Sequence, residues 1–320
     1  MIMNSYYNFF QRYSTQLLLL TILAVLCLFL TWQSDFFMTG KNIKNILEAI
    51  SFRLILAIGM TLIIVSGAID LSAGSIVSLT GVIIALSLKA GLPVAPAVFL
   101  GICSGALLGA INGVIIHISR VNSFIVTLAT ASIYRGLALI LTQGSTISQL
   151  PAAFLFLGRS DVDKLNPPLL IAVPLFILAF PLIHRTKWGQ YVQALGGNEE
   201  ALRRTGIRCG IYRITSFLIL GVCAALTGVI TVARLNSAES NAGIGMELDA
   251  IAAVVMGGTL ISGGKISLVG TGIAVLLLGV IRNGLTIMSV SSFYQQFLIG
   301  LILLVSVIFS EVNERQKTLL

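Results

Sequence analysis

Long apolar stretches separated by short polar breaks make up most of this chain. A membrane-spanning helix needs about 20 apolar residues, with a range of about 17–25. Cutting the sequence at its charged residues leaves stretches near or just below that length. They are residues 14–32, 54–69, 71–88, 95–117, 121–142, 165–184, 214–233, 250–264, 266–281 and 291–310. We therefore expect an all-α polytopic membrane protein with about ten transmembrane helices, several of them short or broken, in one domain over residues 1–320.

Composition agrees with this pattern. Of the 320 residues, 57% are apolar and only 10% are charged, against roughly 25% charged in soluble proteins. The net charge of +8 lies at the ends of the apolar stretches and forms no basic stripe on a soluble fold. This distribution is the bias of Lys and Arg towards cytoplasmic loops and does not indicate a nucleic-acid surface. The expected surroundings are a lipid bilayer, with no nucleic-acid partner.

The longest polar segment, Arg185–Arg213, carries six Lys or Arg and two Glu. The segment 234–249 is instead net negative. With ten spans, the positive bias of cytoplasmic loops places residues 185–213 in the cytoplasm and residues 234–249 outside. The N- and C-termini are then both expected in the cytoplasm.

A short helix is predicted inside the polar segment. Gly196-Gly197 permits a sharp backbone reversal. Asn198 is a favoured N-cap residue, and the two glutamates after it lie at the positive end of a helix dipole. Gly206 can end the helix. Such a helix on the cytoplasmic face is a surface that a soluble partner can contact.

Two glycine patterns concern helix packing and helix breaks. Gly101, Gly105, Gly109 and Gly113 recur every four residues and therefore share one helix face, where another backbone can approach closely. In addition, the stretches that begin at Met60 and Met256 both contain an apolar approach, a Ser-Gly break and an apolar exit. The breaks are Ser66-Gly67 and Ser262-Gly263. Paired Gly-broken spans in corresponding halves indicate a substrate path in transporters.

Three polar residues near or inside apolar stretches are candidates for such a path. Asp70 is costly in a membrane, so it either lines the path or caps the helix that begins at Leu71–Ser72, and the two roles are compatible. Ser72 belongs to the same break. Arg135 lies within an apolar stretch, where it either contacts substrate, pairs with Asp70 or ties two helices together.

The sequence shows no catalytic constellation, and we expect no metal and no cofactor. The nearest match to a phosphate loop is Thr259–Ile266, but Thr259 stands where the first Gly is required and Ile266 where a Ser or Thr should meet magnesium. The chain is therefore not expected to bind nucleotide itself or to act as an enzyme.

Three motifs then point to a family. The stretches GMTLIIVSGAIDLSAGS, ALGGNEEALRRTGI and VARLNSAESNAGIGMELDAIAAVVMGGTLISGGK closely resemble the membrane permeases of bacterial ATP-binding-cassette importers for monosaccharides, and most of all the ribose-transporting branch. The resemblance covers nearly the whole chain. It implies a multi-pass protein of the bacterial inner membrane, a second permease copy, a cytoplasmic ATPase subunit and a periplasmic sugar-binding protein.

The resemblance also assigns roles to residues. Glu200, Ala201 and Gly206 match the family's EAAxxxG signature, which docks the ATPase, while Leu202 replaces its second Ala. The wider coupling segment then comprises Gly196, Gly197, Asn198, Glu199, Glu200, Ala201 and Gly206. In the family, the DLS motif is usually followed by Val, whereas here it is followed by Ala73. Arg282 stands where related permeases commonly have a neutral residue.

The predicted function is therefore transport of ribose or a similar sugar from periplasm to cytoplasm, driven by ATP hydrolysis on the partner chain. An acidic outer lip of Glu239, Glu247 and Asp249 is expected to receive the binding protein. The rival hypothesis is an ion-coupled secondary transporter that uses Asp70 and Arg135. An intramembrane enzyme is a third class, and it lacks a nucleophile–base pair or a metal set.

Overall fold

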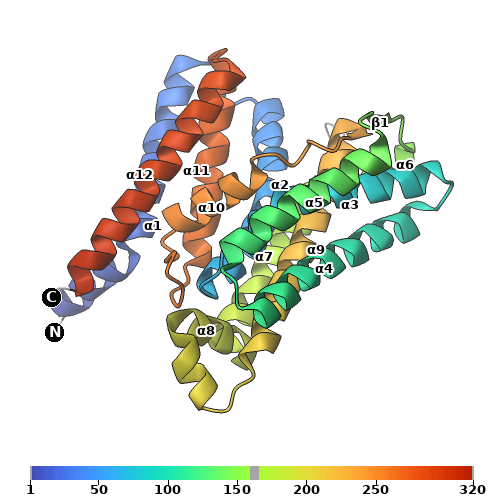
Figure 1. Cartoon of the computed structure of the whole chain (residues 1–320). Helices are drawn as coiled ribbons and strands as arrows, with labels where there is room; N and C mark the ends of the chain where they lie inside the picture. The colour runs from blue at the N-terminus through green and yellow to red at the C-terminus, as the bar shows by residue number, and fades with distance from the viewer. Residues whose placement is uncertain (1, 159–165, 319–320) are drawn as a thin grey trace.

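The computed structural model describes residues 2–158 and 166–318, and these residues form helices joined by short connections (Figure 1). Strands β1 (Ile147–Ser148) and β2 (Ser237–Ala238) pair antiparallel, with Ile147 opposite Ala238. The helices are α1 (Ile2–Gln33), α2 (Gly40–Val65), α3 (Ala73–Lys89), α4 (Val94–Ser119), α5 (Ser123–Thr142), α6 (Ala152–Leu155), α7 (Pro167–Arg185), α8 (Lys187–Arg204), α9 (Cys209–Leu235), α10 (Met246–Met256), α11 (Leu268–Ile287) and α12 (Ser292–Thr318).

The helices confirm a polytopic, all-helical membrane protein but not the count of ten spans. In the part of the chain that the structure describes, seven helices are long and apolar enough to cross a membrane, namely α1, α2, α4, α5, α7, α9 and α11. Helix α10 has only 11 residues, below the usual length of a span, and α3, with 17 residues, is at the lower limit of that length. The predicted span 165–184 begins at a residue outside the described part.

Two predicted boundaries are wrong for an identifiable reason. The predicted stretch 54–69 began after Arg53, yet Arg53 lies inside α2, where Asp249 of α10 lies 3.8 Å from its Nε atom. The predicted stretch 250–264 ignored the break after Met256, where α10 ends and the connection 257–267 begins. The first boundary is wrong because the charge of Arg53 is balanced inside the bundle, and the second because no charged residue marks the break after Met256.

Helix α8 and the β1–β2 pair lie at opposite ends of the bundle (Figure 1). Helices α1 and α11 run in the same direction. Gln16 in the first half of α1 donates a hydrogen bond to Ser267 just before α11, and Leu30 near the end of α1 contacts Gly284 near the end of α11. Helix α12 runs back alongside them, so α1 begins and α12 ends on the side of α8 (Figure 1). This arrangement agrees with the expectation that both termini share a side with residues 185–213, while the cytoplasmic assignment of that side stays a prediction.

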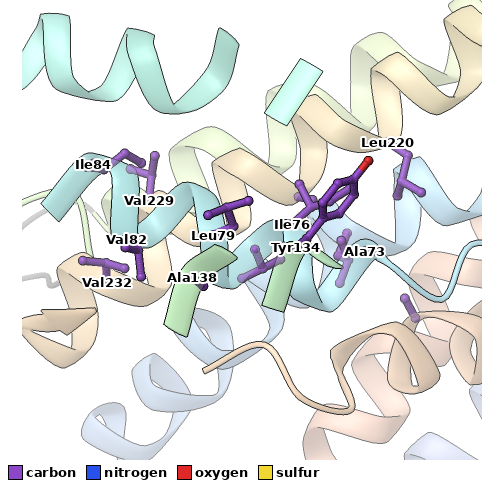
Figure 2. Close-up of a cluster of buried hydrophobic side chains, with 14 of the residues drawn as sticks. Ala73, Ile76, Leu79, Val82, Ile84, Tyr134, Ala138, Leu220, Val229 and Val232 are labelled. Carbon is purple, nitrogen blue, oxygen red and sulfur yellow. The ribbon is translucent and has the colours of Figure 1, made fainter. Parts of the chain in front are cut away.

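The buried core surrounds α2 and α3. Helix α2 packs against α7, α9, α10 and α11, and α3 lies among α4, α5 and α9. Figure 2 shows side chains of α3 meeting those of α5 and α9, among them Ile76, Tyr134 and Val229. A helix that is apolar on all sides is expected to be surrounded by other helices, and α3 fits this rule.

The glycine face of α4 packs closely against other helices, as predicted: Gly105, Gly109 and Gly113 meet α9, and Gly101 meets Ile84 of α3. A methyl group on Gly105 would lie 2.5 Å from the carbonyl oxygen of Gly221, and one on Gly109 would overlap the carbonyl oxygen of Phe217. Since no side chain separates the two backbones, van der Waals contact between the helices is maximal here. The prediction of a close-packing face is confirmed.

Candidate functional site

The two Ser-Gly breaks and α8 meet in direct backbone contact. The backbone N–H of Gly264 donates to the carbonyl oxygen of Val65 at 2.9 Å. A methyl group on Gly196 of α8 would overlap that same oxygen, and one on Gly263 would lie 2.9 Å from both Gly196 O and Gly67 Cα. We call this arrangement of Val65, Gly67, Gly196, Gly263 and Gly264 the glycine junction.

Helix α8 contains the predicted short helix, with one correction. Asn198 interrupts it with φ −161° and ψ 95°, and its Oδ1 accepts from the N–H of Ala201 at 2.9 Å, which confirms the N-cap. Gly206 has φ +83° and donates its N–H to Arg203 O at 3.0 Å, which confirms the stop. The predicted reversal at Gly196-Gly197 is wrong, because both residues are helical and the kink falls on Asn198. At Gly196 the absence of a side chain serves close packing.

The charges of α8 divide between an outer and an inner face. Glu200 pairs with Arg203 and, at 3.2 Å, with Arg204, and its side chain is about half exposed. Glu199 reaches Arg213 of α9 at 2.5 Å and ties the two helices together. Leu202, which departs from the family signature, is buried and packs beside Leu195 and Cys209. Leu202 therefore belongs to a small hydrophobic core between α8 and α9, and the exposed face of α8 is formed by other residues such as Glu200 and Ala201.

The first break, residues 66–72, is held by side chains of α5. The N–H of Ile69 donates to Ser123 Oγ, and that of Leu71 to Thr127 Oγ1, both at 3.1 Å. Asp70 is fully buried, and its Oδ1 accepts from the N–H and the hydroxyl of Ser72, each at 2.6 Å. Backbone outside a helix is tolerated in a membrane only where other groups satisfy it. Helix α3 begins at Ala73 with Ser72 as its N-cap residue, so Asp70 does not occupy the predicted cap position but holds the cap residue Ser72 instead. Its part in the path stays a prediction.

A chain of buried hydrogen bonds continues from Ser72. Asn112 of α4 donates its Nδ2 to Ser72 Oγ at 2.7 Å. The hydroxyl of Tyr134 lies 2.9 Å from Asn112 Oδ1 and 3.0 Å from Leu108 O, between which it shares its hydrogen. The sequence analysis did not include Asn112, although an amide among the glycines of an apolar helix was an available signal.

Arg135 and Glu247 were predicted for different roles. Arg135 lies half-buried in α5, and Glu247 lies in α10. Glu247 lies against Gly74 in the first turn of α3, and its Oε2 has no hydrogen-bond partner among the residues described. No ion pair joins Arg135 to Asp70 in that part of the chain, so the structure gives no support to this pairing.

Asp249 is engaged inside the bundle. Its carboxylate oxygens accept from Nη2 of Arg282 at 2.6 and 2.7 Å, and only 16% of its side chain is exposed. Arg53 stacks over the Phe52 ring with 4.8 Å to the centroid, and these groups line a cavity of about 10 Å³, room for about one water. Arg282 therefore balances Asp249. Of the three predicted lip residues, only Glu239 is exposed.

Comparisons with known proteins agree with this architecture. Residues 42–307 match the family described as branched-chain amino acid transport system / permease component. The ribose import permease RbsC of Escherichia coli (strain K12) is 39% identical over 302 residues, 93% of each chain. That of Bacillus subtilis (strain 168) is 38% identical over 89% of each chain. The D-allose transport system permease AlsC of Escherichia coli (strain K12) is 33% identical over 93% of this chain and 91% of its own.

No solved structure gives a significant match to the chain. The curated relatives nevertheless cover nearly its full length, and the family match includes α2, both breaks, α8 and the helices that carry the charged clusters. These relatives are membrane subunits of transport systems and not enzymes. The chain belongs to the transport-system permease family described for branched-chain amino acids, as one of its membrane-embedded permease components.

Proposed function

We propose that this chain is the permease subunit of an ATP-binding-cassette importer that moves a monosaccharide, ribose or a similar sugar, from periplasm to cytoplasm across the bacterial inner membrane. The support is its similarity to ribose, allose and arabinose permeases. The degenerate phosphate loop at Thr259–Ile266 fits a chain that relies on a partner for ATP hydrolysis. The partners would be a cytoplasmic ATPase subunit, a periplasmic sugar-binding protein and a second permease copy.

The glycine junction is the observation that carries the coupling mechanism. In this mechanism the ATPase contacts the exposed face of α8 around Glu200 and Ala201. Movement of α8 then reaches both breaks directly, since Gly196 touches the end of α2 and the connection before α11 without intervening side chains. Packed backbone is stiff and shifts between discrete arrangements. A small displacement of α8 would therefore move the two breaks together.

The sugar path follows from the polar groups beside the first break. A sugar is neutral and rich in hydroxyl groups, so it needs a few well-placed hydrogen-bond partners in an otherwise apolar passage. Asp70 and Ser72 lie in the break that the junction would move, and Arg135 lies on α5, whose Ser123 and Thr127 hold that break. Glu247 offers a carboxylate oxygen with no hydrogen-bond partner among the described residues. We assign these groups to the path.

The opposite end of the bundle would meet the delivery protein. Glu239 follows β2 and is exposed, whereas Glu247 and Asp249 lie deeper behind it. Exposed charge chiefly orients an approaching partner and speeds its encounter. Of the three acidic residues, Glu239 would therefore make the contact with the binding protein, while Glu247 lies behind it and Asp249 stays paired with Arg282.

Reconstitution of the full complex in proteoliposomes tests the proposal. Ribose uptake should require ATP, the ATPase subunit and the binding protein together, and sugar-loaded binding protein should stimulate ATP hydrolysis. Uptake by the permease alone, driven by an ion or proton gradient without ATPase, would contradict the proposal and favour a secondary transporter.

A further inference from the structure

A large basic cavity opens beside α8, between the end of α4, the start of α5 and the start of α9. Its volume is about 940 Å³. Among the residues that the structure describes, four arginines line it, Arg120, Arg203, Arg208 and Arg213, and one acidic residue, Glu199. The sugar path described above does not need such a concentration of positive charge.

The ion pairs leave two of these arginines without an anion. Glu199 is taken by Arg213 at 2.5 Å, and Arg203 pairs with Glu200. Arg120 and Arg208 are exposed, and neither has an ion pair with any residue in 2–158 or 166–318. Both positive charges line the same cavity, and together they would attract an anion into it.

The backbone favours the same kind of occupant. Arg120 ends α4 in the left-handed region with φ 56°, which costs about 1–3 kcal/mol for a residue other than glycine and is often found at ligand sites. Helix α9, 27 residues long, begins behind Arg208 with no side-chain cap on its first N–H groups. The positive end of a helix next to arginines is a common arrangement for binding phosphate.

The exposed lining of the cavity also includes an apolar part, which we call the rim. Ile118 at the end of α4 is 75% exposed and Ile211 in the first turn of α9 is 52% exposed, and both line the cavity. Basic pockets between transmembrane helices bind the head groups of anionic lipids, whose acyl chains continue along the apolar surface. A soluble phosphate ester would use the arginines but not this rim.

We propose that the cavity binds the phosphate group of an anionic ligand, and that the rim selects phosphate carried by a phospholipid such as phosphatidylglycerol. The guanidinium groups of Arg120 and Arg208 hold the phosphate oxygens, with His117 beside them in the lining. The isoleucines of the rim contact the acyl chains. All residues of this site belong to the permease itself. The permease alone should therefore bind the lipid, whether or not the proposed sugar and ATPase are correct.

The test uses the purified full chain in a neutral detergent, with native mass spectrometry and thermal unfolding as readouts. The probes are phosphatidylglycerol, phosphatidylcholine and inorganic phosphate. The test variant is Arg120→Gln with Arg208→Gln. The control is Arg185→Gln, an exposed arginine at the same end of the bundle and outside the cavity lining.

Phosphatidylglycerol should remain bound and raise the unfolding temperature, and the double variant should bind it about 30-fold more weakly. The control should bind it like the unchanged protein. Arginine-dependent stabilisation by inorganic phosphate alone would support the phosphate site and identify a soluble source. The proposal is overturned if the double variant and the control lose binding equally, or if neither lipid nor phosphate binds through the two arginines.

Discussion

Gly264 donates its backbone N–H to the carbonyl oxygen of Val65 at 2.9 Å, although the two residues lie in different halves of the chain. Gly196 of α8 packs onto the same carbonyl group. One oxygen atom thus joins the end of α2, the connection before α11 and the segment that resembles an ATPase dock. The movement of any one of these elements is constrained by the other two.

Gly196→Ala tests this junction. The added methyl group would overlap Val65 O, and overpacking typically costs about 1–3 kcal/mol. We expect ATP-dependent uptake in proteoliposomes to fall about tenfold or more while the amount of protein in the membrane is unchanged. The matched control is Gly197→Ala, whose methyl group would meet Gly264 Cα at an ordinary 3.8 Å. Equal uptake by the two variants would argue against the junction as the coupling element.

Glu200→Lys tests the dock. The change reverses a half-exposed charge that pairs with Arg203 and Arg204, so three positive side chains would share one turn of α8. Uptake should be abolished although the protein still reaches the membrane, because contact with the ATPase is lost. Co-purification of the ATPase subunit measures this directly. Normal ATP-dependent transport by the variant would exclude Glu200 from coupling.

The Asp249 cluster predicts an asymmetry between its members. Asp249→Asn leaves both Arg53 and Arg282 without their carboxylate, whereas Arg282→Gln leaves Asp249 with Arg53 at 3.8 Å. These side chains keep 16–27% exposure, so the cost should fall below that of a fully buried pair. We expect about 2 kcal/mol for the first change and about half of that for the second, measured by thermal unfolding in detergent. The reverse order would contradict this account of Arg282.

The contact between α4 and α9 predicts a second matched pair of variants. A methyl group on Gly109 would overlap Phe217 O, whereas Gly136 of α5 has nothing within 4 Å of the same position. Gly109→Ala should therefore destabilise the protein by about 1–3 kcal/mol. Gly136→Ala should leave the unfolding temperature unchanged or slightly raised, because Ala favours helix over Gly. Similar unfolding temperatures for both variants would rule out this close packing.

Some features could be read from local sequence because local chemistry decides them. The Asn198 N-cap and the Gly206 stop depend on side-chain and backbone preferences within a few residues. The glycine face of α4 follows from a spacing of four along one helix. These predictions hold because each needs only the geometry of a single helix.

The charged groups could not be assigned in this way. From the sequence, Asp249 is expected in an exposed acidic lip. In the structure it pairs with Arg282 and lies close to Arg53, and both arginines are distant from it in sequence. For Arg135 the sequence left three roles open, namely substrate contact, pairing with Asp70 or a tie between helices, and among the described residues no ion pair joins it to Asp70. A charged side chain within a membrane-spanning segment is stabilised by a partner of opposite charge. The sequence offers several possible partners for each charge and does not show which of them lies close in space.

The sequence by itself therefore determined the class of the protein, the break at Ser66-Gly67 after α2, the face of α4 that packs and the caps of the polar segment. Only the tertiary structure decided that the two Ser-Gly breaks meet at Gly196, that Gly196 is a contact and not a turn, and which acidic residues remain at the surface. The reason is physical. Apolarity and capping act over one helix, whereas close backbone contact and charge pairing depend on how separate helices are arranged around α2.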